Sequence, residues 1–165
     1  MGNRQCTVEI ENKCSVYTLC NPKVFIVSGI YEKSLPPSLG PSESGSGRFI
    51  KTANTACGAV GVLTYDLQND STEKCDGKLA VMYSVPYDYN VYYNWFAVGV
   101  FDVNTDCDYS LYHEMYYGAE RGFARGNAKD KLTYTGKDVT IKATMTDRTI
   151  SLIKVQVFPA SAKHQ

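Results

Sequence analysis

Short segments in which apolar and polar residues alternate recur along this chain, and this alternation constrains its fold more than any other feature. Successive side chains of a β-strand point to opposite faces, so a period of two predicts a strand with one buried and one solvent-facing side. In the clearest case, Val139 and Ile141 alternate with Thr140 and Lys142. Turn residues separate the segments, which predicts an all-β sandwich of two sheets. The predicted strands are 7–10, 24–28, 59–67, 78–85, 95–101, 139–145 and 150–158.

The length of 165 residues fits a single domain, 1–165, with short tails at 1–5 and 159–165. The stretch 35–47 (LPPSLGPSESGSG) has the Pro, Gly and Ser content of a flexible loop. Its glycines do not form a phosphate-binding loop, because no Gly-Lys-Ser/Thr follows into a helix.

The charge balance excludes several partners. Lys plus Arg and Asp plus Glu number 17 each, so no net charge attracts nucleic acid, and no basic run forms a membrane patch. The apolar stretches are far shorter than the roughly 20 residues of a spanning helix. Residues 1–5 do not lead into an apolar segment, so no secretory signal is predicted. We expect a soluble protein, cytoplasmic or released without a conventional signal peptide.

Cysteine and histidine spacing gives no sign of a metal, a cofactor or a catalytic centre. Without a signal peptide, reduced thiols are the favoured state of the cysteines and disulfides are the alternative. His113 and His164 are not spaced with cysteines as zinc ligands are, and no nucleophile or acid–base pair stands out. We therefore predict that the chain is not an enzyme. The six cysteines are Cys6, Cys14, Cys20, Cys57, Cys75 and Cys107.

Two short segments hold an unusual number of aromatic residues: 84–96 (SVPYDYNVYYNWF) and 112–118 (YHEMYYG). Tyrosine has a large apolar ring with a polar tip, so it suits a surface that contacts lipid headgroups or sugars. Pro86, Asp88 and Asn90 favour turns, which places the first group in a loop. This pattern indicates a binding surface. The alternative is a tyrosine-rich core whose hydroxyls reach the rim.

A helix is predicted over 108–117, where Asp106 or Asp108 can cap the start and Gly118 can end it. Leu111 and Met115 are four residues apart and can pack on a sheet. Tyr112, Tyr116 and part of Tyr117 lie on another face. Periodicity leaves two alternatives open, because these tyrosines either fill the seam beside the sheet or face a ligand.

Three segments, 58–67 (GAVGVLTYDL), 79–98 (LAVMYSVPYDYNVYYNWFAV) and 111–118 (LYHEMYYG), resemble the actinoporins, the sea anemone cytolysins that recognise sphingomyelin and form membrane pores. The segment 21–29 (NPKVFIVSG) is also similar to the actinoporin-like proteins of vertebrates, especially fish. The resemblance runs from about residue 6 to 158. It implies a β-sandwich flanked by one or two short helices, with a phosphocholine headgroup site beside one helix.

The resemblance also implies the residues of that site. A quaternary ammonium would lie on tyrosine faces, while hydroxyls would bond the phosphate. Trp95, Tyr93 and Tyr89 are the implied membrane-interface aromatics. The implied headgroup residues are Ser28, Val60, Ser84, Pro86, Tyr92, Tyr112, Tyr116 and Tyr117.

Three departures from the family pattern limit the expectation. The family begins with an amphipathic pore-lining helix, and residues 1–5 stand where that helix should end. Val91 replaces a tryptophan that is prominent in sphingomyelin recognition, and 125–127 (Arg-Gly-Asn) replaces an Arg-Gly-Asp tripeptide. We therefore expect peripheral binding to phosphocholine membranes with weak or no pore formation, and a homo-oligomer on the membrane as a further partner. The alternatives are a pore-forming cytolysin, or a lectin that binds glycans on the same sandwich.

Overall fold

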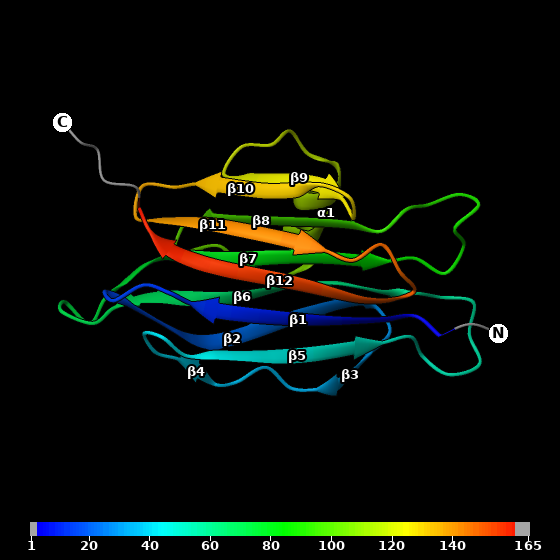
Figure 1. Ribbon diagram of the computed structural model, residues 1–165, viewed down its shortest axis with the longest axis horizontal. Helices are drawn as coiled ribbons and strands as arrows, with labels where there is room; N and C mark the ends of the chain where they lie inside the picture. The colour runs from blue at the N-terminus through cyan, green and yellow to red at the C-terminus, as the bar shows by residue number, and fades with distance from the viewer. Residues whose placement is uncertain (1–2, 161–165) are drawn as a thin grey trace.

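The computed structural model describes residues 3–160, which form two six-stranded sheets packed face to face (Figure 1). The predicted β-sandwich is confirmed. The first sheet has the order β10-β11-β12-β1-β5-β3 and the second has the order β4-β2-β6-β7-β8-β9. The strands are β1 Gln5–Asn12, β2 Tyr17–Ser28, β3 Ile30–Lys33, β4 Ser38–Leu39, β5 Ser44–Ile50, β6 Ala59–Asn69, β7 Cys75–Val85, β8 Trp95–Phe101, β9 Phe123–Asn127, β10 Lys131–Thr135, β11 Val139–Met145 and β12 Ile150–Pro159.

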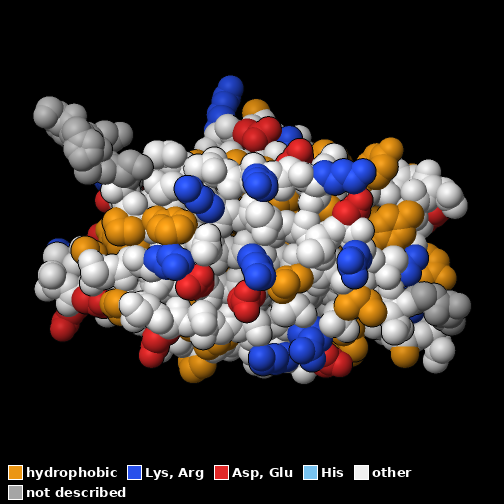
Figure 2. Space-filling view, viewed as in Figure 1, with side chains coloured by type: hydrophobic (Ala, Val, Ile, Leu, Met, Phe, Trp, Pro, Cys, Tyr) orange, Lys and Arg blue, Asp and Glu red, His pale blue; other side chains and the backbone are white. Residues whose placement is uncertain are grey.

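Alternation produces the sandwich as the sequence predicts. On β11, Val139, Ile141 and Ala143 are buried between the sheets, whereas Lys142 and Thr144 are exposed. Each of the seven predicted strands lies in an observed one, although β1, β2 and β7 extend several residues further. On the outer face of the first sheet, Lys and Arg lie among Asp, Glu and uncharged side chains (Figure 2), so this face carries charges of both signs.

The loop predicted at 35–47 is wrong, because β4 and the first part of β5 lie within it. Leu35 and Leu39 are buried in the core, and the Tyr65 hydroxyl donates to the Pro36 carbonyl at 2.6 Å. A Cβ on Gly45 would come within 2.4 Å of Pro36, so the small residues let this segment pack closely. The small residues that suggested flexibility therefore permit close packing here.

The predicted tails also differ from the structure. Gln5 already belongs to β1, Arg4 contacts a distant loop, and Pro159 is the last residue of β12. Residues 1–2 and 161–165 of these predicted tails, His164 among them, lie outside the described residues. The strands β3, β4, β5, β9 and β10 were not predicted from the sequence.

The predicted helix is confirmed as α1, Tyr109–Tyr117. The Asp108 side chain caps its start by accepting from the Leu111 amide at 3.0 Å, and the Gly118 amide donates to the Glu114 carbonyl at 2.7 Å. Leu111 and Met115 are buried against the outer face of the second sheet, in a cluster with Val62, Ala80, Met82, Ala97 and Phe123. Between residues 3 and 160, no helix is long and apolar enough to cross a membrane.

Candidate functional site

A cavity of about 330 Å³ opens where the C-terminal half of α1 meets the loops at one end of the second sheet. We call it the tyrosine pocket. All eight residues that the resemblance implied for a headgroup site line it. The lining residues are Val27, Ser28, Ala56, Cys57, Gly58, Val60, Ser84, Pro86, Tyr87, Asp88, Tyr92, Tyr112, Tyr116 and Tyr117.

The helix supplies three tyrosines that differ in exposure. Tyr112 is 7% exposed and Tyr117 is 63% exposed, while Tyr116 is half-buried between them. The ring centres of Tyr112 and Tyr116 are 5.6 Å apart, and those of Tyr116 and Tyr117 are 4.6 Å apart. Tyr112 therefore fills the seam beside the sheet, Tyr117 faces the solvent, and a ligand on these rings stays a prediction.

Burial favours the protonated form of two pocket phenols, Tyr112 and Tyr116. Desolvation raises the pKa of Tyr112 and of Tyr116 above the ordinary value, and the neighbouring phenols add to both shifts. A protonated phenol has a donor hydrogen and acceptor lone pairs. These hydroxyls can therefore donate to a phosphate oxygen while the ring faces remain available to a cation.

Strand register sets the floor of the pocket. Ser28 pairs with Val60 across β2 and β6, Val60 pairs with Ser84 across β6 and β7, and Ser84 pairs with Trp95 on β8. These residues form one row across four strands, so their side chains share the face that α1 covers. Residues separated by more than fifty positions are thus brought into line by strand pairing.

The 56–58 segment forms one wall, and Gly58 allows it to approach the sheet. A Cβ on Gly58 would lie 2.1 Å from the Val85 carbonyl oxygen and 2.9 Å from the Pro86 Cα. Both contacts are with backbone, which has little room to shift. Gly58 therefore fixes how closely this wall and the start of the 86–94 loop lie.

The 86–94 loop forms the opposite wall and holds its shape through internal bonds. The Asp88 carbonyl accepts from the Val91 and Tyr92 amides, and the Asp88 carboxylate accepts from the Asn90 amide at 2.9 Å. Asp88 is the only charged residue among those that line the tyrosine pocket. A carboxylate on the rim of an aromatic pocket favours a cationic group, and sequence reasoning had used Asp88 only as a turn signal.

The three predicted interface aromatics lie outside the tyrosine pocket. Tyr93 is exposed and lines a separate small cavity with Asn94 and Asn127. Trp95 is half-buried at the start of β8. The Tyr89 hydroxyl donates to the Asn94 side chain at 2.7 Å, so this ring is held within the loop. Tyr93 is the one of the three with most of its ring in solvent.

Arg4 holds the 86–94 loop, and sequence reasoning missed it. Its Nε donates to the Pro86 carbonyl at 2.9 Å and its Nη2 donates to the Tyr87 carbonyl at 2.5 Å. The guanidinium carbon also lies 4.9 Å from the ring centre of Tyr87 and 5.0 Å from that of Tyr89. No local pattern could have shown this contact, because the partners are more than eighty residues apart.

Comparison of the sequence with known proteins identifies its family. A family model described as "Sea anemone cytotoxic protein" matches residues 3–158. The chain belongs to this family, the actinoporins. The deep-sea actinoporin Cjtox I of Cribrinopsis japonica is 31% identical over 116 residues, which are 70% of this chain and 50% of that protein. Conoporin-Cn1 of Conus consors is 28% identical over 166 residues, covering 96% of this chain and 64% of that protein.

A solved structure supports the same fold. The lipid-binding protein Nakanori is similar with a TM-score of 0.73 and 11% identity, over 94% of this chain and 71% of that chain. At this identity the likeness concerns the sandwich alone. This chain spans about half the length of the first curated relatives that it matches.

Val91 and the 125–127 tripeptide, where this actinoporin departs from the family pattern, both lie near the tyrosine pocket or its helix. Val91 lies at the tip of the 86–94 loop and is 62% exposed, so an apolar side chain occupies the tip. Arg125, in the Arg-Gly-Asn tripeptide, donates to the Met115 and Gly118 carbonyls at 3.1 and 2.8 Å. Those carbonyls end α1, and an arginine there satisfies them. Arg125 therefore stabilises the helix that carries the pocket tyrosines.

The cysteines do not gather into a ligand set. All six are free thiols, with Cys6 and Cys14 buried and Cys57 exposed on the wall of the tyrosine pocket. Within residues 3–160, no group of three or more His, Cys, Asp or Glu side chains is placed to hold a metal ion. A larger cavity of about 470 Å³ lies on the outer face of the first sheet. Charged strand residues such as Lys142 and Glu11 line it, and it lacks the aromatic rings of the tyrosine pocket.

Proposed function

We propose that this actinoporin binds membranes peripherally by enclosing the phosphocholine headgroup of sphingomyelin-type lipids in the tyrosine pocket. The observation that carries the proposal is that eight residues from three strands, one loop and one helix line a single cavity with Asp88 on its rim. Each tyrosine face that contacts the quaternary ammonium contributes about 0.5–2 kcal/mol. Several such contacts hold a zwitterionic lipid without any net charge on the protein.

The pocket separates the two charges of the headgroup. The ammonium would lie against the rings of Tyr116 and Tyr117 and near the Asp88 carboxylate. The phosphate would accept from protonated phenols and from the serine hydroxyls of the pocket floor. Val91 and Tyr93 at the exposed side of the loop would enter the membrane interface. Tyr93 would be the stronger anchor, because an aromatic ring favours the headgroup layer more than valine does.

Recognition and permeabilisation are distinct steps in this proposal. The apolar face of α1 is already buried against the sheet through Leu111 and Met115. Releasing it would expose those side chains, so we propose that α1 recognises lipid and does not line a pore. We accordingly expect residues 3–160 to bind vesicles with little leakage, and copies to assemble on the bilayer as the family resemblance implies. Crosslinking with and without vesicles tests that assembly.

The decisive experiment replaces Tyr116 and Tyr117 together by Ala. Loss of two ring contacts should weaken co-sedimentation with phosphatidylcholine–sphingomyelin vesicles at least tenfold, about 1.4 kcal/mol. Tyr109→Ala is the matched control, because Tyr109 is an exposed ring of the same helix outside the pocket. Unchanged vesicle binding in a folded double variant would refute the headgroup site.

Dye release from the same vesicles reports permeabilisation. Inhibition of binding by free sugar but not by phosphocholine would favour the lectin alternative.

A further inference from the structure

A second cavity lies at the same end of the sandwich as the tyrosine pocket and contains two cationic side chains that the proposed headgroup site does not use. Its volume is about 360 Å³, and it lies where the start of β1 meets the end of β5 and the 51–58 loop. Arg4 and Lys51 line it, together with Glu32, Asn3 and Asn54. We call it the cation pocket.

Lys51 is the unusual member of this pocket, because it is a buried lysine residue without an acidic partner. The residue is 8% exposed, and its ammonium donates to the Thr52 carbonyl at 3.1 Å. In the part of the chain that the structure describes, no carboxylate oxygen lies within 4.0 Å of this ammonium. Burying a charge is costly unless a counter-charge compensates it. The Thr52 carbonyl and the Tyr87 ring, 5.7 Å from the ammonium, contribute no counter-charge.

Arg4 adds a second positive charge to the same site. The guanidinium carbon of Arg4 lies 4.9 Å from the ring centre of Tyr87, and the Lys51 ammonium lies 5.7 Å from the same centre. The backbone fixes this arrangement, since the Lys51 amide donates to the Arg4 carbonyl at 2.9 Å. The carbonyl partners of Arg4 satisfy hydrogen bonds but do not cancel its charge.

The nearby carboxylate does not neutralise the pair. Glu32 lines the cation pocket, but its Oε1 accepts from the Arg48 guanidinium at 2.9 Å. Arg48 therefore offsets Glu32, and the charges of Arg4 and Lys51 remain in excess. Two like charges held beside one ring repel each other, and an anion between them would relieve both the repulsion and the burial cost.

We propose that the cation pocket binds a phosphate group, taken from an anionic lipid at the bilayer surface or from free phosphate. Arg4 and Lys51 supply the charge. The Lys51 ammonium has donors that the Thr52 carbonyl does not use, and these would bond the phosphate oxygens. This site goes beyond the proposed phosphocholine function and does not rest on it.

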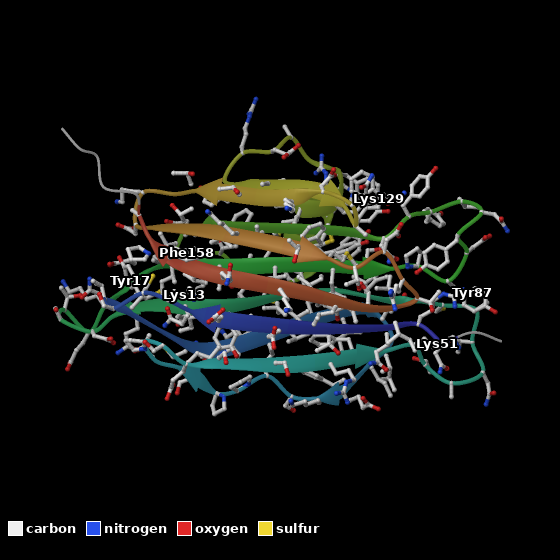
Figure 3. All side chains as sticks on the ribbon, viewed as in Figure 1. Lys13, Tyr17, Lys51, Tyr87, Lys129 and Phe158 are labelled. Atoms are coloured by element: carbon white, nitrogen blue, oxygen red, sulfur yellow. The ribbon has the colours of Figure 1, made fainter. Side chains whose placement is uncertain are left out.

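The position of the cation pocket suits a bilayer that also fills the tyrosine pocket. Lys51 and Tyr87 lie at the same end of the sandwich (Figure 3), where β1 begins and the 51–58 and 86–94 loops extend (Figure 1). The 51–58 loop lines the cation pocket with Ala53 and the tyrosine pocket with Cys57. Tyr87 lines the tyrosine pocket and stands beside the two cations. Two lipids could therefore be held side by side.

Lys51→Met tests the site, because methionine has a similar length and no charge. We expect phosphatidic acid to increase binding of the unaltered protein to phosphatidylcholine–sphingomyelin vesicles. In Lys51→Met, the increase in binding caused by phosphatidic acid should be about tenfold smaller. Binding of this variant to vesicles without phosphatidic acid should be unchanged. Replacing an unpaired buried charge by an apolar side chain should leave the melting temperature unchanged or raise it. Lys51→Gln is a second uncharged variant if the methionine variant does not fold.

Lys131→Met is the matched control, because it removes the same charge from an exposed strand residue outside the cation pocket. A general attraction to anionic lipid would weaken both variants alike, and that result would overturn the proposal. An equal response of Lys51→Met and the unaltered protein would overturn it as well.

Inorganic phosphate without vesicles distinguishes the two sources of the phosphate group. Stabilisation that depends on Lys51 shows that free phosphate suffices, and a Lys51-dependent effect seen only with phosphatidic acid assigns the site to lipid. Loss of the headgroup function would appear separately, in the response to the tyrosine variants.

Discussion

Replacing Arg4 by Met should loosen one wall of the tyrosine pocket while leaving the sandwich intact. The variant keeps an aliphatic stem but loses two hydrogen bonds from the guanidinium to the Pro86 and Tyr87 carbonyls and two ring contacts. Each hydrogen bond contributes about 1 kcal/mol net and each partly exposed ring contact about 0.5–1 kcal/mol. The nominal loss is about 3–4 kcal/mol. Because water can hydrate the freed carbonyls, we expect about 2 kcal/mol, or roughly 30-fold in the opening equilibrium of the loop.

Hydrogen exchange measures this opening directly. The Val91 and Tyr92 amides both donate to the Asp88 carbonyl, so their protection reports whether the 86–94 loop is closed. In Arg4→Met their protection factors should fall by roughly 30-fold, the ratio given by the 2 kcal/mol loss. Amides in the centres of β6 and β7 should not change.

Arg48→Met is the control for charge, because Arg48 forms a surface ion pair with Glu32 and makes no contact with the loop carbonyls. Such a pair contributes about 0–1 kcal/mol. The control should leave the Val91 and Tyr92 amides as they are. Equal protection of these amides in Arg4→Met and the unaltered protein would show that the loop holds its shape through its internal bonds alone, and the reasoning from Arg4 would fail.

Three further variants or probes test the packing and the site. Tyr83→Phe should raise the free energy of unfolding by about 1 kcal/mol in denaturant titrations, because the buried hydroxyl has no partner among residues 3–160; a loss of stability would contradict this. Met115→Ala should lower that free energy by about 2–4 kcal/mol and weaken vesicle binding, because the side chain is fully buried between α1 and the second sheet; unchanged stability would show that the helix docks in another way. Cys57 should react first with a maleimide and be shielded by sphingomyelin vesicles, whereas Cys14, whose pKa burial raises to about 11, should react only on unfolding; an unshielded Cys57 would place the pocket away from the bilayer.

The elements that the sequence predicts are those whose signal is local. Alternation on β11 and β12 and the cap at Asp108 each lie within a few residues, and each is present in the structure. The short edge strand β3 has every residue exposed, so it has no apolar face and no alternation to detect. Pairing with β5 makes it a strand. The 35–47 stretch misled the prediction because its glycines serve close packing, which depends on a core that the composition does not reveal.

The candidate site divides in the same way. The resemblance supplied the eight residues that the structure brings to one cavity, and strand register explains why Ser28, Val60 and Ser84 lie in a row. The resemblance did not supply Arg4 or Lys51. Arg4 precedes β1 and Lys51 follows β5, and both contact the distant 86–94 loop. Nor could it show that Tyr112 is nearly buried while Tyr117 is exposed, since that difference depends on how α1 lies on the sheet.

The two halves of the tyrosine pocket are held by different forces, and this difference determines how the site responds to perturbation. The half formed by α1 and the strand row is fixed by buried apolar contacts, through Met115 and its neighbours, so it is preorganised before lipid arrives. The other half, the 86–94 loop, contributes few buried residues and is held by Arg4 together with the Asn94 side chain, which donates to the Arg148 carbonyl at 2.8 Å. A core variant must therefore lower global stability before it alters binding. A change at Arg4 acts on the 86–94 loop without lowering global stability, because its partners there are the Pro86 and Tyr87 carbonyls. The same guanidinium lines the cation pocket, so a single residue contributes both to the shape of the 86–94 loop and to the charge of the neighbouring cavity.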